Sequence, residues 1–184
     1  MPFRARKPVA LLDEDSLYNY AVKVLGQQMR TVAEVKRLLR RRVETGETGE
    51  AKMEAVVRRL KERKYLDDAG YAQDFTRLRQ ENASFGKRRV QQDLMRKGVQ
   101  ADLIGKTLDA AYENVNEEEL ARRHLERKRV KKPGNEKEAA RVMRLLMRAG
   151  FSSGAIFRIL KKWDVEVEEL AVLEQTGEES ESSD

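Results

Sequence analysis

Three closely spaced aspartates and the single histidine are the side chains whose types and spacing first suggest catalysis or metal binding. Asp67, Asp68 and Asp74 lie close together in the sequence, and carboxylates bind hard cations when several of their oxygens converge. Asp67, however, stands where a helix is expected to begin, which explains it as a helix cap and Asp68 as an acid of the first turn. His124 is the only histidine, so serine-hydrolase chemistry would rest on it alone, and the absence of cysteine excludes a Cys–His pair. We therefore predict no enzymatic activity, no metal and no cofactor.

Arginines form a second set, suited to binding rather than to catalysis. Arg141, Arg144 and Arg148 recur at i, i+3 and i+7, which places them on one stripe of a helix, apart from its apolar residues. Guanidinium groups suit bidentate contacts to phosphate or carboxylate. Basic residues also occupy matching or neighbouring positions of two similar segments, and the predicted partner-binding or DNA-binding set is Arg37, Arg41, Lys87, Arg88, Arg89, Arg96, Lys97, Arg141, Arg144 and Arg148. A single arginine of this set is better explained as part of a solvated face, whereas the repeated stripe favours a binding surface.

A further basic cluster, residues 127–132, runs from an expected helix end into a loop. Positive charge at a helix C-terminus is favourable in itself, so this cluster is the weaker binding candidate. Tyr71 and Phe75 are four residues apart on one helical face. They could stack on bases, but that spacing more often indicates core.

The elements that must position these residues read as helices throughout, because apolar residues recur at spacings of three and four. Thr31 and Glu34 form a capping box, and Gly98 and Gly150 each follow an apolar-periodic segment, where a left-handed residue ends a helix. We expect a polar loop over residues 44–50 and a break at Pro133. The expected helices span residues 14–29, 31–43, 51–63, 68–82, 85–97, 101–113, 117–130, 136–149 and 153–163.

An internal repeat organises these helices. Val90, Leu94 and Gly98 are matched 52 residues later by Val142, Leu146 and Gly150, and a looser copy precedes them. The fold class predicted is therefore all-α, an elongated array of three tandem three-helix repeats that share cores between neighbours. The predicted parts are a basic N-terminal arm (1–13), three repeats (14–66, 67–115 and 116–164) and an acidic, disordered tail (165–184).

Charge is unevenly distributed along the chain. Residues 165–184 carry eight acidic side chains and no basic one, and subtracting these charges from the net charge of +6 leaves +14 for residues 1–164. A strongly basic body indicates a polyanionic partner or a partner with an acidic surface. The tail could fold over the body and compete with such a partner, a hypothesis that the sequence leaves open.

Composition limits the compartment that we expect. The chain has no cysteine, which favours a reducing, cytoplasmic setting. No run of about 18 apolar residues occurs, so we expect no membrane span, and the basic N-terminal residues Arg4, Arg6 and Lys7 are not followed by the apolar stretch of a signal peptide. We expect a monomer.

One combination of motifs resembles a known family. Tyr65-Leu66-Asp67-Asp68, then Tyr71 and Phe75, then the segment from Gly86 to Gly98, is similar to the central signature of the RecX family, the bacterial regulators of the RecA recombinase. The resemblance covers about residues 16–164 and implies tandem three-helix repeats. It further implies a non-enzymatic regulator that binds RecA filaments on DNA and typically inhibits strand exchange, ATP hydrolysis and the coprotease activity of DNA-damage signalling.

Two other functions remain open from the residues alone. A standalone helical module could bind single- or double-stranded DNA, or RNA, through the basic stripe. A helical scaffold for an acidic protein partner would need the same charge. The resemblance places the RecA filament first among the expected partners.

Overall fold

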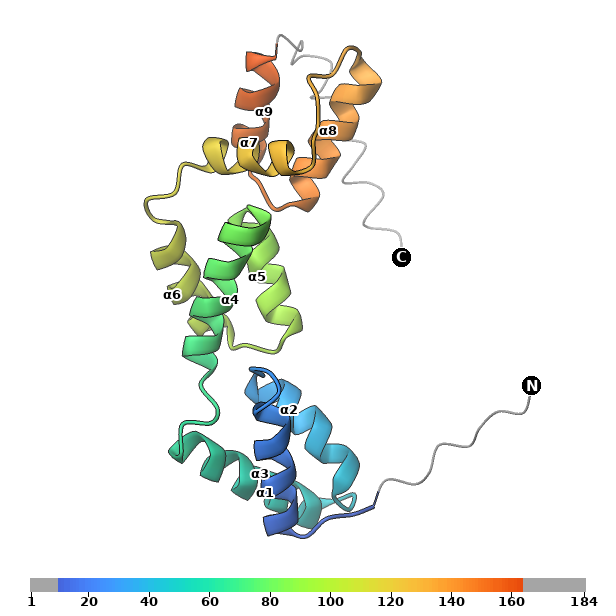
Figure 1. The fold of residues 1–184 in the computed structure, drawn as a ribbon, viewed down its shortest axis with the longest axis vertical. Helices are drawn as coiled ribbons and strands as arrows, with labels where there is room; N and C mark the ends of the chain where they lie inside the picture. The colour runs from blue at the N-terminus through green and yellow to red at the C-terminus, as the bar shows by residue number, and fades with distance from the viewer. Residues whose placement is uncertain (1–9, 164–184) are drawn as a thin grey trace, which may run out of the picture. The chain divides into compact units, whose positions relative to one another are not determined.

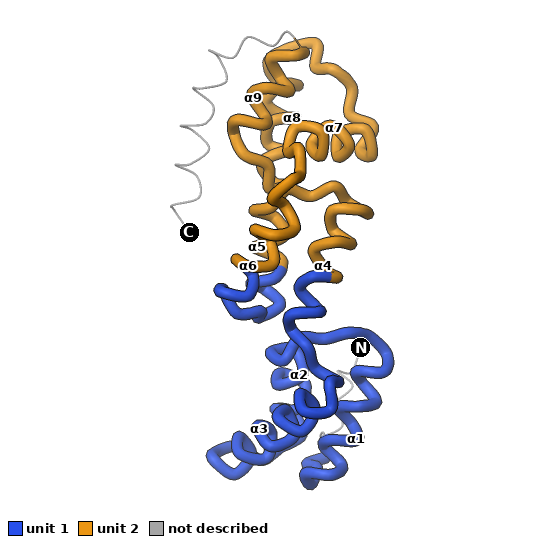
Figure 2. The backbone as a smooth tube through the Cα atoms, turned by 90° about the vertical axis from the view of Figure 1, so that its left-hand side faces the viewer, with its two compact units in different colours: residues 1–73, 94–104 blue, residues 74–93, 105–184 orange. Residues whose placement is uncertain are grey.

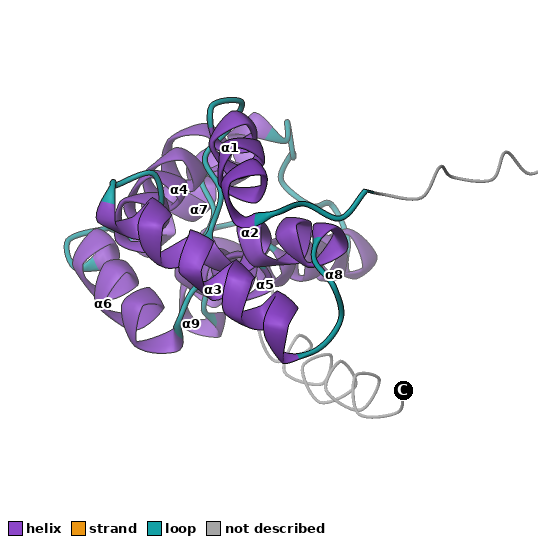
Figure 3. Cartoon of the chain, turned by 90° about the horizontal axis from the view of Figure 1, so that it is seen from below, coloured by secondary structure: helices purple, strands orange, loops and turns teal. Residues whose placement is uncertain are grey.

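The computed structural model describes residues 10–163, and Figures 1 and 3 show helices joined by loops over this range. The elements are α1 (Glu14–Leu25), α2 (Val32–Leu39), the 3-10 helix η1 (Arg40–Arg42), α3 (Glu47–Glu62), α4 (Asp68–Ala83), α5 (Lys87–Arg96), α6 (Ala101–Tyr112), α7 (Glu117–Arg127), α8 (Glu136–Arg148) and α9 (Ser153–Lys162). Between residues 10 and 163 there is no strand, which confirms the all-α prediction. Most of the predicted basic arm and the whole predicted acidic tail lie outside the described residues.

The chain divides into two compact units, coloured separately in Figure 2. One unit contains residues 1–73 and 94–104, and the other contains residues 74–93 and 105–184. The divisions fall inside α4, α5 and α6, so the helices of the predicted second repeat contribute to both units.

In the first unit, α1, α2 and α3 pack on one another around an aliphatic core. Leu17, Leu39, Met53 and Leu60 are fully buried there. Burial of such side chains is worth about 1.5–3 kcal/mol each, the main force that holds these short helices together.

In the second unit, α7, α8 and α9 surround the larger cluster. Leu120, Leu146, Phe151 and Ile156 are buried at its centre, and Trp163 packs against it at the end of α9.

The predicted caps are confirmed. The Thr31 hydroxyl accepts from Glu34 N at 3.1 Å, and the Glu34 carboxylate accepts from Thr31 N at 3.2 Å, which completes the capping box. Asp67 accepts from Ala69 N at 2.9 Å, at the start of α4. Gly98 and Gly150 have φ of 79° and 86°, the left-handed conformation expected of residues that end α5 and α8.

Four predicted boundaries were wrong by three or four residues. Among them, α2 ends at Leu39 rather than at residue 43, where the 3-10 helix η1 follows it, and α7 ends at Arg127 rather than at residue 130. The first helix ends at Leu25, with Gly26 as its C-cap, rather than at residue 29. The predicted loop over residues 44–50 is shorter, because α3 already begins at Glu47. Gly49 explains the early start of α3: a Cβ there would lie 1.8 Å from the Glu44 carbonyl oxygen, so glycine permits this first turn to pass over the preceding backbone.

The second helices of neighbouring predicted repeats (α2, α5 and α8) contact each other in the same way twice, the start of one against the end of the next. We call each such contact a joint. In the first unit the start of α2 contacts the end of α5, where the Thr31 hydroxyl donates to the Lys97 carbonyl at 2.6 Å. In the second unit the start of α5 contacts the end of α8, where Gly86 N donates to the Ala149 carbonyl at 2.9 Å. The repeat offsets derived from the sequence relate Thr31 to Gly86 and Lys97 to Ala149.

Candidate partner-binding surfaces

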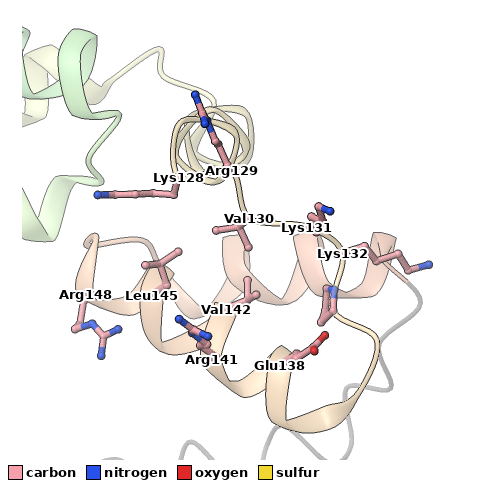
Figure 4. A pocket seen from close by; sticks show the side chains of 11 residues that line it. Lys128, Arg129, Val130, Lys131, Lys132, Glu138, Arg141, Val142, Leu145 and Arg148 are labelled. Carbon is pink, nitrogen blue, oxygen red and sulfur yellow. The ribbon is translucent and has the colours of Figure 1, made fainter.

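A basic groove lies on the second unit, between the chain that leaves α7 and the helix α8 (Figure 4). Its volume is about 630 Å³, within the range of roughly 300–1,000 Å³ typical of ligand pockets. It is lined by Lys128, Arg129, Val130, Lys131, Lys132, Pro133, Glu138, Arg141, Val142, Leu145 and Arg148. Six of these eleven side chains are cationic and one is a carboxylate, so the groove suits a negatively charged occupant. We call these residues the α8 groove.

The floor of the α8 groove is apolar. Figure 4 shows Val130 of the loop facing Val142 and Leu145 of α8. Val130 and Leu145 are half-buried at the edge of the core cluster that contains Val142. The groove therefore combines cationic walls with an apolar base.

The fold of α8 explains why its arginines face outward. Ala139, Val142, Met143 and Leu146 take the buried face, and the arginine stripe falls on the remaining surface. Arg141, Arg144 and Arg148 are all exposed. Within residues 10–163 these three arginines make no ion pair, and two of them, Arg141 and Arg148, line the α8 groove.

The groove brings together two sets of basic residues that the sequence analysis treated separately. It joins two residues of the predicted stripe to the basic cluster after α7, which sequence reasoning ranked as the weaker candidate. The helix-dipole explanation of that cluster holds only for its first residues, because α7 ends at Arg127. No local signal in the sequence indicates this meeting, because it depends on how the loop after α7 packs along α8.

Two of the predicted cations of α5, Lys87 and Arg89, have partners of their own. Lys87 lies 2.7 Å from Asp109. Arg89 Nε lies 3.3 Å from Asp93, in an ion pair without hydrogen-bond geometry, and its guanidinium lies 5.5 Å from the centroid of the Phe85 ring. Arg88 and Arg96 are exposed.

Lys97 acts at the joint of the first unit. Its ammonium lies 2.7 Å from the Glu34 carboxylate, which also completes the capping box of α2. The hydrogen bond that Lys97 donates to the Glu34 carboxylate raises the pKa of Lys97, so its charge is held in this ion pair. Burial opposes ionisation of Glu34, but its hydrogen bonds and the charge of Lys97 leave the pKa of this carboxyl lowered.

The two predicted cations of the first repeat lie on separate elements. Arg37 is exposed on α2 and donates from Nε to the Ala33 carbonyl at 3.3 Å. Arg41 is exposed in η1, beyond the end of α2. The ten predicted residues thus comprise exposed cations and cations already engaged by carboxylates, and their role in binding stays a prediction.

Two of the three carboxylates first considered for chemistry, Asp67 and Asp68, accept backbone hydrogen bonds at helix starts. Asp68 accepts from Val32 N at 2.9 Å and so supports the start of α2, a role that the sequence did not reveal because the two residues are far apart. Asp74 lies 2.9 Å from Arg77 on the surface of α4. Among residues 10–163 no three His, Cys, Asp or Glu side chains gather to hold a metal ion.

His124 is buried. Its Nδ1 lies 2.8 Å from the Ala83 carbonyl oxygen, a geometry in which Nδ1 carries the proton. The ring lies between Phe85 and Phe151, with centroids 5.7 and 6.0 Å away. Burial lowers the pKa of His124 despite the carbonyl partner, so the side chain is a neutral part of the core at pH 7.

None of the helices over the described range is long and apolar enough to span a membrane.

Two family models match this chain. The model of the second three-helix domain of RecX matches residues 67–108, and the model of the third three-helix domain matches residues 116–160. Regulatory protein RecX of Leptothrix cholodnii is 35% identical over 152 residues, which is 82% of this chain and 91% of that protein. Regulatory protein RecX of Oceanobacillus iheyensis is 29% identical over 88% of this chain, which spans only 59% of that longer protein.

Solved structures show the same fold. A crystal structure of RecX from Lactobacillus salivarius superposes with a TM-score of 0.64 at 20% sequence identity, over 83% of this chain and 97% of that one. A second crystal structure of a regulatory protein RecX also gives a TM-score of 0.64, at 22% identity. The two matching domain models and the Leptothrix relative show that the chain belongs to the RecX family of regulatory proteins.

Proposed function

We propose that this protein binds RecA nucleoprotein filaments and modulates them, typically by inhibiting recombinase, ATPase and coprotease activity, and that it thereby regulates DNA repair. Membership of a family of regulatory proteins carries this proposal. Because its target would be RecA on bacterial DNA, the proposal places the protein in the cytoplasm, where it would act as a monomer.

The action proposed is binding without catalysis. The ionisable groups that suit chemistry have structural partners: Asp67 and Asp68 accept backbone hydrogen bonds at helix starts, and His124 donates to a carbonyl inside the core. A regulator of this kind changes the activity of RecA through its affinity for one state of the filament.

The contact surface that we propose centres on the exposed arginines of α8. Arg141, Arg144 and Arg148 make no ion pair within the described residues, so a partner that binds them breaks no ion pair among residues 10–163. Exposed guanidinium groups can each contact a phosphate or a carboxylate through two parallel hydrogen bonds. Arg37, Arg41, Arg88 and Arg96 are the further exposed members of the proposed surface.

The DNA-dependent ATPase of the matching RecA tests the proposal. Added protein should lower the rate of ATP hydrolysis at amounts near or below one molecule per RecA. An unchanged rate, under conditions where RecA alone is active, would overturn the proposed function.

A second candidate is a standalone module that binds DNA or RNA, favoured by the net charge of +14 over residues 1–164. Such a module would bind naked nucleic acid tightly, with an affinity that falls steeply as salt rises. Fluorescence anisotropy with a labelled oligonucleotide across a salt series separates the two. Weak binding to naked DNA together with strong filament binding supports the RecA regulator, and the reverse supports the module.

A further inference from the structure

The α8 groove is built for an occupant that is both acidic and apolar. Its cationic walls would attract carboxylates, and its base of Val130, Val142 and Leu145 offers apolar surface. A purely phosphate ligand would use the walls and leave this base unused. The chemistry of the groove therefore favours a peptide that mixes glutamate with aliphatic side chains.

This chain carries such a peptide immediately after α9. Residues 165–174 read Val-Glu-Val-Glu-Glu-Leu-Ala-Val-Leu-Glu, with four glutamates, five aliphatic Val or Leu residues and no cation. We call residues 165–174 the acidic–aliphatic segment. Beyond it, residues 175–184 are acidic and polar but contain no Val or Leu.

Connectivity within the second unit places the origin of this segment close to the groove. A short turn joins α8 to α9 and the two helices pack side by side, so the end of α9 returns toward the start of α8 (Figure 1). Trp163 and Val130 pack on the same core cluster. Ten extended residues can reach about 33 Å, whereas α8 with its 13 residues is about 20 Å long.

From charge, apolar content and reach, we propose that the α8 groove is the docking site of the chain's own acidic–aliphatic segment. The glutamates would pair with Arg141, Arg148 and the lysines of the loop, and Val or Leu side chains would cover the apolar base. Docked in this way, the segment would occupy two of the three exposed α8 arginines and would compete with any acidic or phosphate-bearing partner.

A single spin label tests the docking. The chain has no cysteine, so Ser180→Cys gives one attachment point for a nitroxide on the full chain. At low salt, the amide signals of residues 130–148 should lose most of their intensity by paramagnetic relaxation, while those of α1 and α3 keep theirs. Uniform loss over all helices, or no loss at the groove, would overturn the proposal.

Matched charge variants of the tail separate the segment from general attraction. In the labelled chain, Glu166, Glu168, Glu169 and Glu174 are changed to Gln. In the control, Glu178, Glu179 and Glu181 become Gln and Asp184 becomes Asn, which removes the same charge. The first set should restore the groove signals, and the control should leave them attenuated. If both sets restored the groove signals equally, net charge alone would explain the attraction, and docking of this segment would be contradicted.

Variants on the groove side complete the test. The pair Arg141→Glu and Arg148→Glu should restore the signals, whereas Lys23→Glu with Lys106→Glu, also exposed cations, should not. The groove signals could instead keep their intensity in the labelled chain and shift when a single-stranded oligonucleotide is added. In that case the groove is a phosphate site and the proposal is wrong. RecA is absent from these measurements, so their outcome is independent of the ATPase test.

Discussion

Arg89 and Arg141 occupy equivalent positions of two repeats, yet the structure uses them differently. Arg89 is half-buried beside Asp93 and Phe85, whereas Arg141 is exposed at the α8 groove. The difference lies four residues further along each helix, where one repeat has Asp93 and the other has Leu145. The residue at i+4 therefore decides whether an arginine of the stripe is held in an ion pair or is exposed for binding. The spacing of the arginines alone does not separate these two groups.

Charge reversal at these two positions should separate the roles. Arg89→Glu would place a carboxylate beside Asp93, and we expect the free energy of unfolding to fall by about 1–3 kcal/mol. Arg141→Glu should stay within about 0.5 kcal/mol of the parent, as is usual for an exposed site. Urea unfolding followed by circular dichroism measures both, and equal losses would contradict the assignment.

Burial of neutral His124 predicts a pH dependence of stability. Burial lowers its pKa in the folded state below the ordinary value of 6.5, so the unfolded chain binds more protons and stability rises with pH. The free energy of unfolding should therefore fall as pH drops through 6.5 toward the lower folded pKa. His124→Asn keeps a side-chain donor but does not titrate, so its free energy of unfolding should vary less between pH 7.5 and pH 5. An equal slope in both proteins would show that other groups cause the effect.

At the scale of elements, the recurring joint explains two glycines. A Cβ on Gly86 would lie 2.3 Å from the Gly150 carbonyl oxygen, and one on Gly150 would lie 2.2 Å from Arg89 N. Only residues without a Cβ let the start of α5 approach the turn after α8. In the first unit, Gly98 performs this role against Ala33 of α2, at 2.4 Å.

Substitution of these glycines should be costly for this reason. Gly86→Ala forces two backbone segments apart, and we expect unfolding to become easier by about 2 kcal/mol or more. Gly105→Ala is the matched control, because a Cβ there meets nothing within 4 Å on the exposed side of α6. That control should raise stability by up to about 1 kcal/mol, through better helix propensity. Thermal unfolding compares the two, and a neutral Gly86→Ala would contradict the joint.

Local features of the sequence predicted most of the helices but not their joints. The capping box at Thr31, the cap at Asp67 and the left-handed Gly98 depend on neighbouring residues, so they could be recognised directly. The hydrogen bond from Thr31 to the Lys97 carbonyl and the support of Val32 by Asp68 depend on tertiary packing, for which the sequence carries no local signal. The α8 groove escaped prediction for the same reason.

The whole molecule combines a basic body with the helical domains of a family of regulators. The exposed arginines of α8 supply available charge, the caps and joints hold the helices, and the RecX domains supply the expected target. We propose that the protein acts on RecA filaments through the positive charge of the exposed α8 arginines. Reversing the charge of the α8 arginines should therefore weaken the inhibition of RecA, whereas reversing the charge of other exposed cations should not.

The ATPase of DNA-bound RecA, measured with three forms of the full chain, tests this claim most directly. The parent should inhibit, and the variant with Arg141, Arg144 and Arg148 changed to Glu should lose most of that inhibition. The control with Lys23, Arg58 and Lys106 changed to Glu carries the same charge change at exposed sites and should inhibit as the parent does. A folded α8 variant that inhibits normally, or a parent that leaves the ATPase rate unchanged, would contradict the account.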